Sequence, residues 1–89
     1  MEKLNIFIVE DESIVAKDIQ NSLTKLGYNV LGMANNGQEA LERIEELGPD
    51  LVLMDIMIKG NMTGIDVSER IKEKMNIPVI FLTAYADEG

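Results

Sequence analysis

The sequence predicts an α/β domain built on a doubly wound parallel sheet, and two observations support this fold class. Short runs rich in β-branched and aromatic residues alternate with longer segments whose apolar residues recur at helical spacing. Because parallel strands need crossover connections, the order strand, helix, strand, helix, strand, helix, strand favours one parallel sheet. The expected strands at 4–10, 51–58 and 77–84 are almost continuously apolar, which is typical of parallel strands covered on both faces.

Capping signals place the remaining elements. The first helix follows the strand at 4–10 and should end at Gly27. A weaker strand at 28–34 precedes a second helix that Asn36 caps and Gly48 ends, and Thr63 caps the third. The residues expected on the buried sides of these helices are Ile14, Val15, Ile19, Leu23, Leu26, Ala40, Leu41, Ile44, Leu47, Ile65, Val67, Ile71 and Met75.

Composition limits the possible functions. The 89 residues predict a single domain, 1–89, and the absence of cysteine and histidine excludes thiolate sites, disulfides and histidine ligands. The formal net charge of -8 disfavours direct binding to nucleic acid. No apolar run is long enough to span a membrane or resembles a signal peptide, so the expected location is the cytoplasm.

Acidic side chains stand where two of the expected strands end. Glu10 and Asp11 follow the first strand, Asp55 interrupts the apolar run LVLMDIMI, and Thr83 closes the fourth strand. Ligands of doubly wound sheets bind outside the carboxyl ends of the strands, where the winding direction reverses. If the first and third strands are neighbours, these carboxylates lie within a few Å of one another.

Such a carboxylate cluster favours a bound cation. With oxygen ligands alone, the fitting ion is Mg²⁺ or Mn²⁺, held by one or two carboxylates, a backbone carbonyl and waters. An open site of this kind indicates phosphoryl transfer. Each residue by itself is more simply a helix cap, a turn former or an ordinary strand residue, and the hypothesis depends on their coincidence at separate strand ends.

The stretches IFIVEDE, LVLMDIMI with the later TGID, and IPVIFLTA together resemble the motifs of the response-regulator receiver domain of two-component signalling. The resemblance implies a flavodoxin-like parallel sheet with strand order 2-1-3-4. It also implies that this (βα)3β chain lacks the family's fourth helix, fifth strand and fifth helix, and is a C-terminally incomplete receiver domain.

The resemblance also implies a role for each site residue. Asp55 would be the phosphoacceptor, and Glu10, Asp11, Asp55 and the backbone carbonyl of Met57 would hold Mg²⁺. Thr83 would contact the phosphoryl group through its hydroxyl, and Ala84 would leave room for the donor. The partner would be a sensor histidine kinase or a phosphotransfer protein, and the domain would not be an enzyme beyond catalysing its own phosphorylation and dephosphorylation.

Three departures from the family pattern stand out. Glu10 occupies a position where many relatives have Asp, and the loop after Asp55 is longer and lacks a common proline. No residue here matches the lysine of the family's fifth strand, so phosphorylation by small donors is expected to be poor. The fourth strand should form an exposed apolar edge, which predicts a homo-oligomer or a domain swap.

Two alternatives from other classes stay open. The chain could be a structural, self-associating fragment without phosphoryl chemistry. It could also be a phosphohydrolase with an aspartyl nucleophile, but that class needs an Asp two positions after the nucleophile, where this sequence has Met57.

Overall fold

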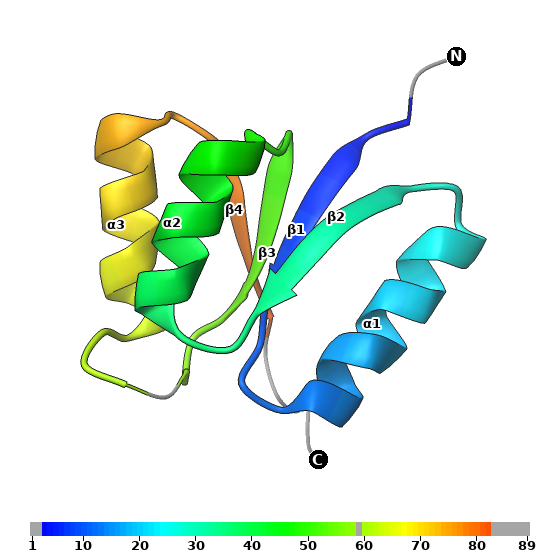
Figure 1. The fold of residues 1–89 in the computed structure, drawn as a ribbon, viewed down its shortest axis with the longest axis horizontal. Coiled ribbons are helices and arrows are strands. Elements are labelled where there is room, and N and C mark those ends of the chain that lie inside the picture. Colours follow the sequence, from blue (N-terminus) through cyan, green and yellow to red (C-terminus); the bar gives the residue numbers. More distant parts are fainter. Residues whose placement is uncertain (1–2, 59, 83–89) are drawn as a thin grey trace.

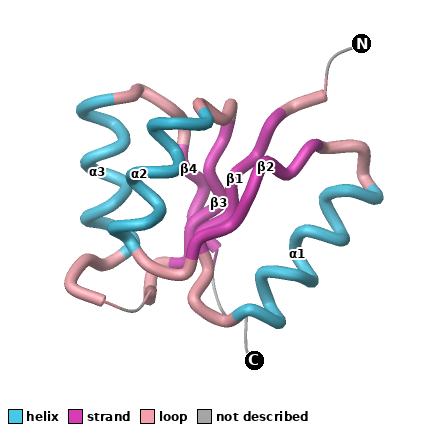
Figure 2. Tube along the Cα trace, viewed as in Figure 1, coloured by secondary structure: helices cyan, strands magenta, loops and turns pink. Residues whose placement is uncertain are grey.

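The computed structural model describes residues 3–58 and 60–82, and this part of the chain has the predicted alternation of strands and helices. Figure 1 shows the arrangement of these elements, and Figure 2 shows the strands as one layer between helices. In chain order the elements are β1 (Asn5–Val9), α1 (Ser13–Lys25), β2 (Asn29–Ala34), α2 (Gly37–Leu47), β3 (Leu51–Asp55), α3 (Gly64–Lys74) and β4 (Val79–Leu82).

The sheet is parallel throughout, with strand order β2-β1-β3-β4, as predicted. The chain moves from β1 outward to β2 and then returns past β1 to β3, so the winding direction reverses between β1 and β3. Helix α1 covers one face, whereas α2 and α3 lie side by side on the other (Figure 1). The carboxyl ends of β1 and β3 therefore lie next to each other at the switch point.

The helix ends follow the signals in the sequence. Gly27 adopts a left-handed φ of 98° after α1, and its N–H donates to the Thr24 carbonyl at 3.1 Å. Asn36 caps α2 by accepting a 2.9 Å hydrogen bond from the Glu39 N–H. At the start of α3, Thr63 and Asp66 form a capping box in which each side chain accepts from the other's N–H at 3.1 Å. Such caps contribute about 1 kcal/mol each.

The main core lies between the sheet and the pair α2 and α3. Alternate residues of β1 face it, since Phe7 and Val9 belong to this core whereas Ile6 and Ile8 are buried outside it. The complete cluster is Phe7, Val9, Ala34, Ala40, Ile44, Val52, Met54, Ile58, Val67 and Ile71. This packing holds β1 and β3 rigidly under the site.

Two isoleucines that the helical spacing predicted to be buried are exposed. Ile14 is 83% exposed and Ile65 is 50% exposed. Each stands two positions before a buried residue, Ala16 or Val67, and so lies about 200° around the helix from it. Leu26, the residue that ends α1, is 72% exposed. Val15 and Leu47, which the helical spacing also predicted to be buried, are each 38% exposed.

Strand β4 differs from the prediction that the fourth strand is covered on both faces. It pairs with β3 at the edge of the described sheet, and Ile80 and Phe81 are 51% and 37% exposed. The sequence also predicted an exposed apolar edge at the fourth strand. The described part of the sheet agrees with that second expectation.

Candidate functional site

The strands themselves bring the first carboxylates together. The register pairs Val9 with Met54, so the next residues, Glu10 and Asp55, leave neighbouring strands at the same level. The Glu10 N–H donates to the Ala34 carbonyl of β2 at 3.0 Å, which extends the ladder by one residue and anchors the backbone at this point.

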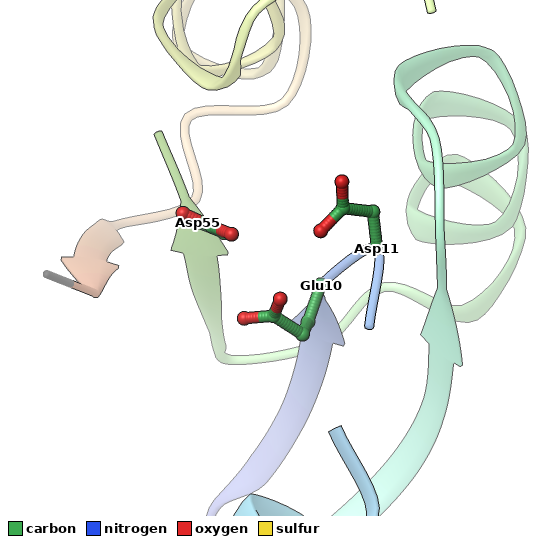
Figure 3. Close-up of side chains that lie close together, drawn as sticks. All are labelled: Glu10, Asp11 and Asp55. Carbon is green, nitrogen blue, oxygen red and sulfur yellow. The ribbon is translucent and has the colours of Figure 1, made fainter. Parts of the chain in front are cut away.

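Asp11 completes the cluster from the loop between β1 and α1. Figure 3 shows Glu10, Asp11 and Asp55 directing their side chains toward a common space. One carboxylate oxygen from each residue lies within 4.8 Å of the others. The predicted proximity of these acids is therefore confirmed, whereas their roles stay predictions.

Glu10 is the most buried member of the cluster, with 7% of its surface exposed. The pKa of its carboxyl is raised from 4.5 to about 7, chiefly by burial, whereas the hydrogen bond from the Glu12 N–H acts to lower it. The negative charge of Asp55, a side-chain hydrogen bond with Asp55 and the charge of Asp11 make smaller contributions to the same upward shift. Without a cation, Glu10 therefore holds a proton up to nearly neutral pH.

Asp55 is oriented by the loop that follows it. The Met57 N–H donates to Oδ1 of Asp55 at 3.1 Å, although the Met57 side chain points outward and is 77% exposed. The same loop closes onto α3, because the Gly64 N–H donates to the Ile56 carbonyl at 2.9 Å. The predicted site residues Thr83 and Ala84 lie outside the described residues.

The chemistry of the donor set fits Mg²⁺. Three carboxylates converge on one space, and the sequence has neither histidine nor cysteine to favour a softer metal. Asp11 and Asp55 are partly exposed, which allows a cation to keep waters and to accept oxygens of a further ligand. The residues that could hold it are Glu10, Asp11 and Asp55.

Comparison with known proteins identifies the family. The sequence profile of the response regulator receiver domain matches residues 6–89. The chain belongs to the receiver-domain family. Its flavodoxin-like fold and the position of its acidic cluster at the switch point agree with this membership, and two-component signalling is the setting in which receiver domains work.

Two curated relatives are similar to this chain over most of its length. The transcriptional regulatory protein PdtaR of Mycobacterium tuberculosis is 38% identical over 81 residues, which cover 91% of this chain and 39% of the relative. The chemotaxis protein CheY of Thermotoga maritima is 38% identical over 85 residues, covering 94% of this chain and 70% of that protein. The chain thus spans about two fifths of the first relative.

A solved structure agrees with the fold. The signal receiver domain of a modulated diguanylate cyclase from Desulfovibrio desulfuricans G20 superimposes with a TM-score of 0.88 at 38% identity. The match covers 94% of this chain and 67% of that one. The arrangement of strands under the acidic cluster is therefore one that a similar receiver domain shares.

Proposed function

We propose that this receiver domain accepts a phosphoryl group on Asp55 from the phosphohistidine of a sensor histidine kinase or phosphotransfer protein, in the presence of Mg²⁺. The observation that carries the proposal is the convergence of Glu10, Asp11 and Asp55 within 4.8 Å at the switch point. Receiver-domain membership supports the same conclusion.

In this reaction a carboxylate oxygen of Asp55 attacks phosphorus. A P–O bond forms to Asp55 while the P–N bond to the donor imidazole breaks, and the bonding electron pair returns to the imidazole nitrogen. The Met57 N–H donates to Oδ1 at 3.1 Å and so holds the carboxylate in one orientation for the attack. Its position at the end of β3 keeps this carboxylate at the rim of the sheet.

Each remaining site residue has an assigned part. Asp11 and Asp55 would hold the metal directly, Glu10 largely through water, and the Met57 carbonyl would complete the protein ligands. When bound, Mg²⁺ supplies positive charge that neutralises the transferred phosphoryl oxygens. Thr83 and Ala84 keep their proposed roles as phosphoryl contact and access residue on the strength of the sequence motif.

The test uses phosphoramidate, a small donor whose P–N bond resembles that of phosphohistidine. The receiver domain is incubated with this donor and Mg²⁺, and uptake is located by mass spectrometry under neutral conditions. We expect an acyl phosphate at Asp55 that hydroxylamine removes. The site of modification and its metal dependence are the readouts, whatever the rate.

Two controls decide the outcome. Asp55→Asn should abolish uptake, and an excess of chelator should abolish it in the parent chain. Uptake that persists in Asp55→Asn, or that is equal with and without Mg²⁺, would refute the proposal. Hydrolytic turnover of phosphate monoesters at Asp55 would instead favour the phosphohydrolase alternative.

A separate observation favours self-association as a second property. Ile80 and Phe81 are exposed on β4, which has β3 as its only partner among the described strands. We propose that chains 1–89 form a homo-oligomer or a domain swap through this edge. Sedimentation velocity should show concentration-dependent association that Ile80→Lys weakens, and a monomer at all concentrations would exclude it.

The proposed location is the cytoplasm. None of the helices in the described part of the chain has the length and hydrophobicity that crossing a membrane requires. A sequence without cysteine is compatible with a reducing compartment, where cytoplasmic kinase domains would meet the receiver domain.

A further inference from the structure

Gly64, the first residue of α3, packs directly against the backbone of the proposed phosphoacceptor. A methyl group added to its Cα would overlap the Asp55 carbonyl oxygen and would lie 2.9 Å from the Ile56 Cα. These neighbours are backbone atoms, so they cannot rotate away as the end of a flexible side chain can. The space at this position therefore admits glycine alone without a shift of the backbone.

The backbone conformation at position 64 does not require a glycine. The described glycines with positive φ are Gly27, Gly48 and Gly60, and Gly64 is not among them. Glycine loses more conformational freedom on folding than alanine does, so an alanine would be preferred here if space allowed. The close approach of α3 to Asp55 is the remaining physical reason.

Two further sets of hydrogen bonds fix the first turn of α3 next to the site. The Gly64 N–H donates to the Ile56 carbonyl at 2.9 Å, and the capping box of Thr63 and Asp66 fixes the start of the helix. Residues 55 and 56 are thus held by both packing and hydrogen bonding. The next residue, Met57, is the one whose N–H bonds Oδ1 of Asp55.

We propose that Gly64 is a positioning residue for the phosphoacceptor site. By letting α3 begin against the backbone of residues 55 and 56, it sets the directions of the Asp55 carboxylate and of the Met57 peptide. The inference deepens the proposed function, and its metal-binding readout rests on that function. A metal-free readout tests the positioning independently.

The experiment compares Gly64→Ala with the matched variant Gly37→Ala. Gly37 is also a buried first residue of a helix, and an added Cβ would lie 2.7 Å from Cγ2 of Val67 and 3.2 Å from Cβ of Met62. The crowding is thus similar, but it falls on side-chain atoms of Val67 and Met62 and not on the backbone of Asp55. Gly37→Ala therefore controls for general strain at a helix start.

Mg²⁺ affinity is measured first, by following amide chemical shifts during titration with the metal. Loss of groups that orient metal ligands weakens metal binding by about 10- to 100-fold. We expect Gly64→Ala to bind Mg²⁺ at least about 10-fold more weakly than the parent. Gly37→Ala should stay close to the parent.

The second measurement is made without metal. In Gly64→Ala the Met57 amide signal should shift, because its bond to Oδ1 of Asp55 is disturbed, whereas Gly37→Ala should shift signals around Val67 and leave Met57 unchanged. If the parent itself binds no Mg²⁺, the proposed function fails. The metal-free Met57 amide signal then still tests whether Gly64 positions Asp55 and Met57. A folded Gly64→Ala with parent-like Met57 signal and Mg²⁺ affinity would overturn the inference, as would equal losses in Gly37→Ala.

Thr63→Ala covers the case in which Gly64→Ala does not fold. It removes the side-chain acceptor of the capping box and adds no atom near Asp55. We expect faster hydrogen exchange at the Gly64 amide together with a shifted Met57 amide signal. Faster exchange at Gly64 with an unchanged Met57 signal would show that the start of α3 does not position the site, and would reject the proposal.

Discussion

The Met57 N–H and Oδ1 of Asp55 form a 3.1 Å hydrogen bond, so the residue after next fixes the orientation of the proposed nucleophile. Oδ1 accepts this bond, and the Asp55 side chain points toward the space shared with Glu10 and Asp11 (Figure 3). The two oxygens of Asp55 therefore have different surroundings before any ligand binds. Mutations of Asp55 can therefore be chosen to keep or to remove the bond to the Met57 N–H.

Asp55→Asn should remove the negative charge of Asp55 and leave the conformation of the following loop unchanged. The amide keeps an oxygen that can accept from Met57 N–H, so the loop should retain its conformation, and the Met57 amide signal should change little. Because the charge of Asp55 is one cause of the raised pKa of Glu10, its removal should lower the pKa of Glu10. An NMR titration of the Glu10 carboxyl measures this, and an unchanged pKa would contradict the direct interaction of the two groups.

Asp11→Ala should weaken Mg²⁺ binding by more than about 10-fold, because it removes a proposed direct ligand. The matched control is Asp18→Ala on the exposed surface of α1, which makes the same change in net charge away from the cluster. Calorimetric titration with Mg²⁺ compares the two variants. Equal weakening in both would indicate general electrostatic attraction and not coordination by Asp11.

The pH dependence of stability should carry the signature of Glu10. Its pKa is raised from 4.5 to about 7 in the folded chain, so between these values the folded state binds more protons than the unfolded state. The contribution of Glu10 to the free energy of unfolding is therefore largest below pH 4.5 and falls as the pH rises to about 7.

Urea unfolding of the metal-free parent and of Glu10→Gln tests this contribution, since the two chains differ in this one group. The stability of the parent relative to Glu10→Gln should decline across that pH range. Added Mg²⁺ should offset the decline, because the cation stabilises the charged carboxylates. A difference between the two chains that is independent of pH would be inconsistent with the raised pKa.

Two isoleucines on α3 should respond very differently to truncation. Ile71 is fully buried in the core, and Ile71→Ala should lower the free energy of unfolding by about 2–5 kcal/mol. Ile65 on the same helix is 50% exposed, and Ile65→Ala should cost less than about 1 kcal/mol. Chemical denaturation gives both values, and similar losses would show that the face of α3 is assigned incorrectly.

The order of elements could be predicted from the sequence because its signals are local. Apolar runs, helical spacing and caps such as Asn36 and Thr63 depend on residues within one or two turns, and the structure confirms them. The proximity of Asp55 to Glu10 could be predicted as well, because parallel strands bring their carboxyl ends to one edge. The prediction for Ile65 is wrong because an apolar residue does not always belong to the buried stripe: Ile65 lies about 200° around the helix from Val67.

What the sequence determined by itself is the parallel α/β fold and the gathering of acids at one edge of the sheet. Only the tertiary structure decided the burial that raises the pKa of Glu10, the exposure of Ile80 on β4, and the packing of Gly64 against Asp55. The physical reason is range: periodicity and capping are written into neighbouring residues, whereas burial and close backbone contacts depend on which distant segments meet and how closely they pack.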